Sequence, residues 1–413
     1  MSSVDYQLVV GLEVHVQLKT LTKLFCGCST TFGAAPNTQT CPVCLGHPGT
    51  LPVLNREAIR LAIRTGLALN STIPPTTKWD RKNYFYPDLP KGYQISQFDQ
   101  PICQGGELKL PGDETSSPRT IRITRAHLEE DAGKSMHDES SGSADSRIDL
   151  NRTGTPLLEI VSEPDIRSAE EAKQYLTELK LLLTYLQVSD CNMQEGSLRV
   201  DANVNLHLQR GDELVATPIV EIKNLNSFRA VERALVYEAQ RQREVFEDTG
   251  QRIGEAPKQT RGWDDNLQVT KVQREKEESS DYRYFPDPDL VPIMLPESWV
   301  TELKSDLGAL PAALRERLKT EFGLSQYDAD VIVNQGPDMV AYFEAVASNL
   351  KDAKRASNWI QQDVMRTLND MEYSLADFSI KADDLAKLLQ LIEAGELDTV
   401  SYTHLRAHET RSY

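Results

Sequence analysis

The sequence predicts an α+β catalytic domain followed by an all-helical domain. At 413 residues the chain exceeds the roughly 250 to 300 residues at which a single core stops growing. Up to about residue 295 strand patterns alternate with a few helical ones, whereas the pattern beyond it is almost wholly helical. We therefore place a boundary near Pro292–Pro296, with the first domain at residues 1–295 and the helical domain at residues 296–400.

Two segments of the first domain predict strands with one apolar and one polar face. In residues 12–18 four apolar side chains alternate with Glu13, His15 and Gln17. Residues 198–208 follow the same two-residue period and leave a polar row on one face, formed by Arg199, Asp201, Asn203 and Asn205. We expect this polar row to line a cleft.

Helical spacing of apolar residues predicts a packing helix that begins at Ser168 and runs to about Leu186, with Ser168 and Glu171 forming a capping box. Similar patterns predict a short helix over Asn55–Leu69 and a second helix from Asn226 or Ser227 to about Phe246. The second domain is expected to be a small helical bundle. Its predicted helices are Pro311–Phe322, Gln326–Asn334, Pro337–Asn349, Ala353–Asp370 and Ala382–Ala394.

Composition excludes several classes of protein. With 39% hydrophobic and 26% charged residues, and no apolar run of the roughly 18 to 20 residues that a membrane helix needs, membrane insertion is not expected. The first residues do not resemble a secretory signal, so we expect a cytoplasmic protein. A net charge of −17 argues against indiscriminate coating of nucleic acid, so any RNA contact must be local.

Four of the six cysteines form two close pairs. Cys26 and Cys28 are followed after twelve residues by Cys41 and Cys44, and each pair can supply two corners of a tetrahedral zinc site. Because four protein ligands leave no position for water, we expect structural rather than catalytic zinc. The alternative is four reduced thiols near a surface loop.

Acidic residues suggest a second metal site. Glu159 interrupts an apolar run that predicts a buried strand, where a lone carboxylate needs a partner. Glu129 and Glu130 are adjacent, so they point to opposite faces of a strand, and periodicity does not say which enters a site. If Glu130, Glu159 and His15 meet, mostly oxygen ligands favour Mg²⁺ or Mn²⁺. A buried salt bridge at Glu159 and a solvent-facing polar pair at Glu13 and His15 are the alternatives.

A complete P-loop motif for nucleotide binding is absent from the sequence. Gly133-Lys134-Ser135 resembles the end of a P-loop, but Leu128 stands where that pattern needs glycine. Arg81–Tyr86 and Asp281–Phe285 mix basic and aromatic residues, a composition suited to phosphate contacts with base stacking. Ordinary turns are the alternative, because Pro-Asp follows both segments.

Five segments, read together, closely resemble the B-subunit family of the tRNA-dependent amidotransferases, and the resemblance extends over roughly residues 5–398. The segments that carry it are Val10–Leu18, Asp80–Asp88, His127–Lys134, Asn151–Glu159 and Asp281–Pro286.

The resemblance implies a cradle domain with an amidophosphotransferase-like antiparallel sheet, followed by a helical domain. It also implies that ATP phosphorylates the side-chain carboxylate of Glu-tRNA(Gln) or Asp-tRNA(Asn). Ammonia from a partner amidase, the A-subunit, then displaces phosphate, in a complex that includes a small C-subunit.

The family's site residues can be carried over position by position. His15, Glu130 and Glu159 resemble its Mg²⁺ ligands, which would place ATP phosphates beside Glu13. Lys82 and Asp201 resemble cleft residues near the nucleotide or the acceptor end, so Glu13, Lys82 and Asp201 are the expected catalytic residues. The four cysteines resemble the family's structural zinc site.

Residues 401–413 depart from the family pattern. There we expect a foreign tail in place of the family's tRNA-binding tail domain, with weakened tRNA affinity and an intact ATP site. Two rival functions remain open at this point, a non-catalytic tRNA-binding scaffold with structural zinc and a free-standing metal hydrolase.

Overall fold

The computed structural model divides the chain into two compact units, Met1–Gly308 and Ala309–Tyr413. It describes residues 6–112, 117–137, 146–210, 213–275 and 281–396, so the expected tail at 401–413 lies outside the described residues. Helix α4 (Glu297–Ser305) follows the predicted boundary but belongs to the first unit. The guanidinium of Arg56 on α1 (Arg56–Ala68) lies 5.3 Å from the ring of Trp299 on α4, which ties α4 to that unit.

A ten-stranded sheet forms the first unit, with β1 (Tyr6–Gln17) between β10 (Pro156–Ser162) and β11 (Leu198–Arg210). The pairings are antiparallel except that between β13 and β14, and the predicted α+β class is confirmed. The other strands are β5 (Cys103–Gln104), β6 (Glu107–Leu110), β7 (Arg119–Glu130), β12 (Glu213–Ala216), β13 (Val220–Leu225), β14 (Gln259–Asp264) and β15 (Val269–Glu275).

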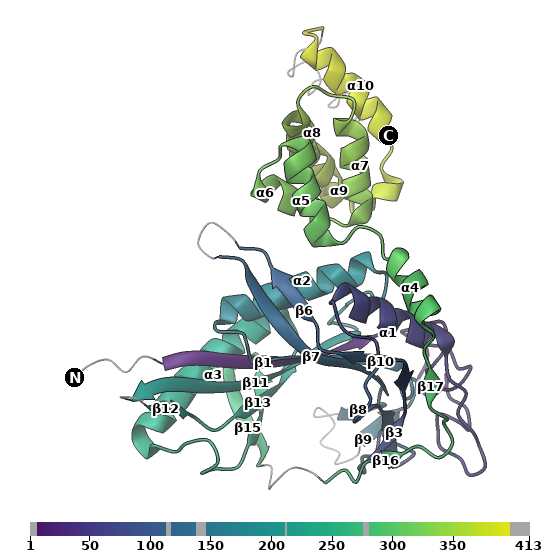
Figure 1. Cartoon of the computed structure of the whole chain (residues 1–413), viewed down its shortest axis with the longest axis vertical. Coiled ribbons are helices and arrows are strands. Elements are labelled where there is room, and N and C mark those ends of the chain that lie inside the picture. Colours follow the sequence, from purple (N-terminus) through teal and green to yellow (C-terminus); the bar gives the residue numbers. More distant parts are fainter. Residues whose placement is uncertain (1–5, 113–116, 138–145, 211–212, 276–280, 397–413) are drawn as a thin grey trace. The chain divides into compact units, whose positions relative to one another are not determined.

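The two faces of the sheet differ in polarity. On β1, Leu12, Val14 and Val16 are fully buried, as the alternation of the sequence predicts. Helices α2 (Ala169–Tyr185) and α3 (Phe228–Thr249) lie along one side of the sheet (Figure 1). On the other side lie the small strands β3 (Asp80–Asn83), β8 (Lys134–His137), β9 (Ser146–Asp149) and β16 (Phe285–Pro286) (Figure 1). The helices therefore cover the apolar face of the sheet, and the candidate site lies on the polar face.

Helix α2 begins at Ser168, as predicted, because the Ser168 hydroxyl accepts a hydrogen bond from the backbone N–H of Glu171 at 3.1 Å. The capping box is incomplete, since the Glu171 carboxylate accepts from the backbone N–H of Arg167 instead. Helices α1 and α3 begin after Asn55 and Ser227, whose side chains also cap the first turn.

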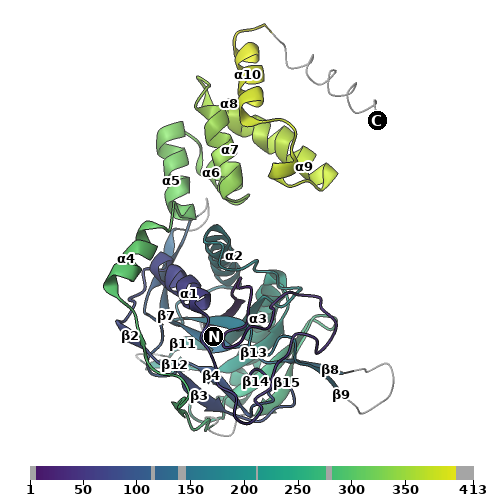
Figure 2. The same ribbon diagram turned by 90° about the vertical axis from the view of Figure 1, so that its right-hand side faces the viewer.

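Small strand pairs bring distant segments together. The two basic-aromatic segments of the sequence meet in a three-stranded sheet of β16 (Phe285–Pro286), β3 (Asp80–Asn83) and β4 (Tyr93–Ser96). Strands β2 (Thr76–Thr77) and β17 (Ile293–Met294) form a second pair. The hairpin of β8 (Lys134–His137) and β9 (Ser146–Asp149) projects from the large sheet (Figure 2).

The second unit is helical, and the predicted helix positions are confirmed to within a few residues. A π-helical turn at Ile360–Val364 interrupts the long helix expected over 353–370. The α-helices are α5 (Pro311–Phe322), α6 (Gln326–Val333), α7 (Pro337–Ala347), α8 (Ala353–Trp359), α9 (Met365–Met371) and α10 (Ala382–Glu393), with a 3₁₀ turn at Leu375–Asp377. Within the described ranges, none of the helices of either unit has the length and apolar character to span a bilayer.

Candidate active site

Strand register assembles a polar row across four neighbouring strands. His15 lies opposite Glu159 of β10 and opposite Arg199 of β11, and Glu159 in turn lies opposite His127 of β7. Residues directly opposite in antiparallel strands share a face, so these four side chains project from the polar face of the sheet. Glu129, two residues beyond His127, projects from the same face.

The row gathers His15, Glu129 and Glu159 so closely that one ligand atom from each lies within 4.8 Å of the others. His15 Nε2 is 3.5 Å from Glu159 Oε2 and 4.0 Å from Glu129 Oε1. His127 Nε2 lies 3.3 Å from the same Glu159 oxygen. Among the described residues, only these two imidazoles lie within ion-pair distance of the two carboxylates. Two largely buried carboxylates without a lysine or arginine at contact distance suit a cation ligand set.

The cluster perturbs the pKa of its members strongly. Burial alone would raise the pKa of the Glu159 carboxyl, but His127 and His15 hold that pKa well below its usual range. Burial lowers the pKa of each imidazole, yet the carboxylates outweigh it, so the pKa of His127 rises to about 9 and that of His15 also rises. The Glu159 carboxylate is therefore ionised at neutral pH, as a metal ligand must be.

Glu130 does not lie at this cluster. The expected set of His15, Glu130 and Glu159 differs from the observed one because Glu129 takes the place of Glu130. Its side chain points to the opposite face from Glu129, where it pairs with the ammonium of Lys91 and accepts from the backbone N–H of Ile95. Gly154, with φ of 81°, passes close by, and a Cβ there would lie 3.5 Å from Glu130 Oε1 and 3.6 Å from Cys44 Cβ. The Glu130 side chain therefore lies between the backbone of β7 and the loop that carries the cysteines.

Lys82 on β3 lies beside the acidic cluster. Its Nζ is 4.9 Å from the ring centroid of Tyr282 and 5.7 Å from that of Tyr84, so aromatic faces hold the ammonium in place. Burial lowers the pKa of Lys82, but the surrounding groups, first Glu129, then the tyrosines Tyr284 and Tyr84 and more weakly Glu159, together outweigh burial and raise that pKa above its usual value. Lys82 therefore carries a permanent positive charge near the cluster.

Glu13 and Asp201, opposite each other on β1 and β11, continue the polar face beyond His15. Glu13 Oε1 accepts a hydrogen bond from Asn203 Nδ2 at 2.8 Å. Lys223 Nζ pairs with Asp201 and lies 2.9 Å from Glu221 Oε1, so it neutralises much of this second acidic group. The predicted cleft residues are thus on one face, with Asp201 already occupied by an ammonium.

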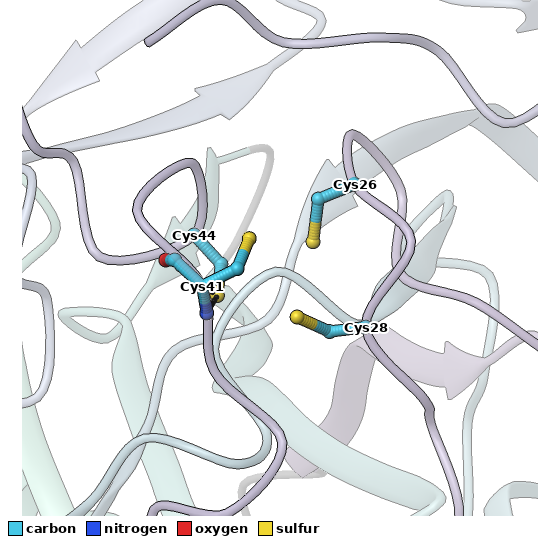
Figure 3. A group of neighbouring side chains, drawn as sticks. All are labelled: Cys26, Cys28, Cys41 and Cys44. Atoms are coloured by element: carbon cyan, nitrogen blue, oxygen red, sulfur yellow. Dashed lines mark hydrogen bonds between the residues drawn. The ribbon is translucent and has the colours of Figure 1, made fainter.

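The four cysteines converge as a zinc site requires. Their sulfur atoms lie within 4.8 Å of one another and turn toward a common centre (Figure 3). A tetrahedral ion with Zn–S bonds of about 2.3 Å would space them by roughly 3.8 Å, so the donor set fits. The ammonium of Lys23, which is fully buried, lies 3.6 Å from Cys44 Sγ. The Cys26 side chain and Lys23 lower the pKa of Cys44 to about 4, which favours a metal-binding thiolate.

The sequence predicts no role for His127 or Lys223, and the resemblance to the family favours Glu130 where the strand pattern leaves Glu129 and Glu130 open. The signal for the residues of β7 was present in the strand itself. His127 and Glu129 alternate with the buried Ala126 and Leu128, which is the same two-residue period that identified the polar face of β1.

Comparison with known proteins gives matches over nearly the whole chain. The family described as the GatB/GatE catalytic domain matches residues 8–301, and the GatB domain matches residues 341–403. A relative from Rhodopirellula baltica is 63% identical over 97% of this chain and 82% of its own length, and it is named as the B-subunit of aspartyl/glutamyl-tRNA(Asn/Gln) amidotransferase. Relatives of the same name from Moorella thermoacetica and Caldanaerobacter subterraneus are 50% and 51% identical over 95% and 94% of this chain, and over 81% and 79% of their own lengths.

Proposed function

The chain belongs to the GatB/GatE family, and on that premise we propose that it does the work of the B-subunit of an aspartyl/glutamyl-tRNA(Asn/Gln) amidotransferase. It activates the side-chain carboxylate of Glu-tRNA(Gln) or Asp-tRNA(Asn) with ATP, and ammonia from a partner glutaminase, the A-subunit, then completes the amide. A small C-subunit belongs to the same complex. We place the reaction in the cytoplasm, where aminoacyl-tRNA is used.

The observation that carries the proposal is the cluster of His15, Glu129 and Glu159 on the polar face of the sheet. We propose these three residues as ligands of Mg²⁺, with Glu129 in the place first expected of Glu130. When bound, the ion supplies charge neutralisation for the ATP phosphates. His127 holds the Glu159 carboxylate from the side away from His15 and orients it.

The reaction needs positioning and charge more than a covalent nucleophile. A carboxylate oxygen of the aminoacyl group attacks the γ-phosphorus of ATP and ADP leaves, which gives an acyl phosphate. Ammonia then attacks the carbonyl carbon, inorganic phosphate leaves, and a proton is lost from nitrogen. Lys82, charged and fixed by tyrosine rings, supplies positive charge where phosphoryl oxygens gain negative charge. Glu13, held by Asn203, borders the same face.

The four-cysteine cluster is proposed as a structural zinc site, because its sulfurs and the neighbouring Lys23 suit a dianionic tetrathiolate centre. Both proposed metal sites and the cleft residues lie in the first unit. We therefore assign the activation chemistry to that unit and leave tRNA-body contacts to the remainder of the complex.

The test is ATP hydrolysis by the chain in complex with its partner subunits. Mg²⁺-dependent hydrolysis should be stimulated by Glu-tRNA(Gln) or Asp-tRNA(Asn), and comparing the two identifies the acceptor. His15→Ala and Glu159→Gln should abolish hydrolysis while tRNA binding and the thermal unfolding midpoint stay close to wild type. If both variants hydrolyse ATP at the wild-type rate, the chain is a tRNA-binding scaffold and the proposal fails.

A further inference from the structure

One buried carboxylate lies beside the metal cluster without belonging to it. Asp131 directly follows β7, and its side chain is 3% exposed. Its Oδ2 atom accepts a hydrogen bond from Gln17 Nε2 at 2.8 Å. The same oxygen lies 2.8 Å from Arg199 Nη2 and 3.5 Å from Arg152 Nε. A single carboxylate oxygen therefore meets three side chains that come from three other parts of the chain.

Two of these side chains stand next to His15. Gln17 is the last residue of β1 and follows His15 by two positions, so both side chains project from the same face. Arg199 on β11 lies directly opposite His15. Asp131 stands in the same relation to Glu129, which precedes it by two positions. Because β10 lies between β1 and β7 in the sheet, the bond from Gln17 to Asp131 joins two strands that do not pair with each other.

The third side chain, Arg152, comes from the segment that leads into β10. Its Nε donates to Ala132 O at 2.9 Å and its Nη2 donates to Gly133 O at 2.6 Å, so two carbonyls fix the plane of the guanidinium. Asn151 beside it is anchored on the cysteine loop, since its Oδ1 accepts from the backbone N–H of Gln39 at 2.8 Å. The guanidinium is therefore held in place before it reaches the carboxylate.

The backbone of Asp131 is fixed as firmly as its side chain. Its N–H donates to Thr155 O at 2.9 Å, and its carbonyl accepts from the N–H of Gly154 at 2.8 Å. These bonds close the end of the sheet at which β7 stops and β10 begins. Strand ends open more readily than the middle of a sheet. Glu129 is the second-last residue of β7, so the cluster lies close to an end that needs such closure.

The cluster depends on the spacing of strands that do not pair with each other. His15 Nε2 on β1 is 4.0 Å from Glu129 Oε1 on β7. The groups that hold a ligand generally have to be placed to within about 0.5 Å of the productive geometry. The bond from Gln17 to Asp131 spans the same two strands two residues further along, so it fixes the separation on which the cluster depends.

We propose that Asp131 is a positioning residue of the cluster: its carboxylate holds β1 and β11 against β7 and so sets the spacing of His15 and Glu129 for a divalent cation. The inference rests on the proposed function, which assigns the cation to that cluster. Asp131 is not a ligand itself, because it lies outside the group of converging donors and because two guanidinium groups at its Oδ2 repel a cation.

The first unit offers a matched control. Glu238 on α3 is fully buried, and its Oε1 lies 2.6 Å from Arg241 Nη2 and accepts from Gln242 Nε2 at 3.0 Å. Arg261 Nε lies 3.7 Å from its Oε2. Glu238 and Asp131 are thus both buried carboxylates held by two arginines and one glutamine. Helix α3 covers the apolar face of the sheet, so the loss of the Glu238 charge should affect stability without reaching the cluster.

The experiment compares Asp131→Asn with Glu238→Gln in the full chain. Both variants should lower the urea concentration at the unfolding midpoint, because each leaves two guanidinium groups without their carboxylate. A titration with Mn²⁺ monitored by electron paramagnetic resonance is then made on each folded variant. Only Asp131→Asn should weaken Mn²⁺ binding, by roughly tenfold or more, as is typical when a group that orients metal ligands is lost.

Two further variants keep the test decisive if Asp131→Asn folds poorly. Gln17→Ala removes the contact from β1 without unpairing a charge, and it too should weaken Mn²⁺ binding. The double variant Gln17→Glu with Asp131→Asn exchanges donor and acceptor, so an amide on the β7 side donates to a carboxylate on β1 and the arginines keep an anion. This double variant should recover most of the Mn²⁺ affinity.

The contrary results are distinct. If wild type binds Mn²⁺ and both Gln17→Ala and folded Asp131→Asn bind it equally well, the inference is overturned while the proposed function stands. An equal loss of Mn²⁺ affinity in Glu238→Gln would overturn it too, because the effect would then follow stability in general. A double variant that regains stability but no Mn²⁺ affinity would overturn the role of the link between β1 and β7. Absence of Mn²⁺ binding by wild type would instead reject the metal cluster of the proposed function.

Discussion

Strand alternation makes opposite predictions for two adjacent glutamates. Glu129 faces the cluster, and Glu130 faces Lys91 on the other side of β7. Glu129→Gln removes one of the two carboxylate ligands proposed for the divalent ion, whereas Glu130→Gln removes none. We therefore expect Glu129→Gln to weaken metal binding and Glu130→Gln to destabilise the fold.

The sizes of the two effects can be worked out. Two unit charges 4 Å apart attract by about 4 kcal/mol at an effective dielectric of 20, and a divalent ion doubles this gross value. If desolvation offsets about two thirds of this attraction, Glu129→Gln costs about 2.7 kcal/mol of metal-binding free energy, which is roughly a hundredfold in metal affinity. Glu130→Gln leaves the Lys91 ammonium, whose side chain is 8% exposed, without its anion, which typically costs about 3 to 5 kcal/mol of folding free energy.

A titration with Mn²⁺ monitored by electron paramagnetic resonance measures the metal affinity of each variant. Unfolding in urea measures the folding free energy of each variant. The control is the double variant Lys91→Met with Glu130→Gln, which removes both charges and should recover most of the stability lost in Glu130→Gln. A folded Glu130→Gln protein that loses as much Mn²⁺ affinity as Glu129→Gln would refute the assignment of faces.

Four further outcomes are expected. Because the folded-state pKa of His127 is about 9 against about 6.5 unfolded, its protonation stabilises the metal-free fold fully below pH 6.5, and this stability is lost as pH rises toward 9. Mn²⁺ affinity should rise over the same pH range, because the competing protons leave the cluster. In the His127→Asn variant, both the free energy of unfolding and the Mn²⁺ affinity should depend less on pH. Cys41→Ser should lower the zinc content found by atomic absorption from about one ion per chain, and an unchanged zinc content would contradict the assignment of the cysteines as zinc ligands. Lys82→Met should lower the rate of phosphoryl transfer at least about tenfold with little change in Mn²⁺ affinity. Lys223→Met leaves Asp201 without its ammonium, so calorimetry should show increased divalent-ion binding at Glu13 and Asp201.

The sequence predicts the elements of this fold well, because local signals define them. The side chains of Ser168 and Ser227 cap the helices whose starts they predict, and the alternation in residues 12–18 identifies the buried face of β1. The π-helical turn at Ile360–Val364 is the exception. Ile360 and Val364 are buried there, and no local pattern of the sequence predicts the turn.

The site is less predictable, because its geometry depends on register between strands far apart in the chain. Alternation says that His15 and Glu159 each face one side of a strand, but only the pairing of β1 with β10 places them opposite each other. Adding β7 brings His127 into the same row and fixes which of the adjacent glutamates can join. A shift of the pairing between β7 and β10 by a single residue would exchange Glu129 for Glu130 at the cluster, so the long-range register, not the composition of the motif, decides which carboxylate can hold the ion.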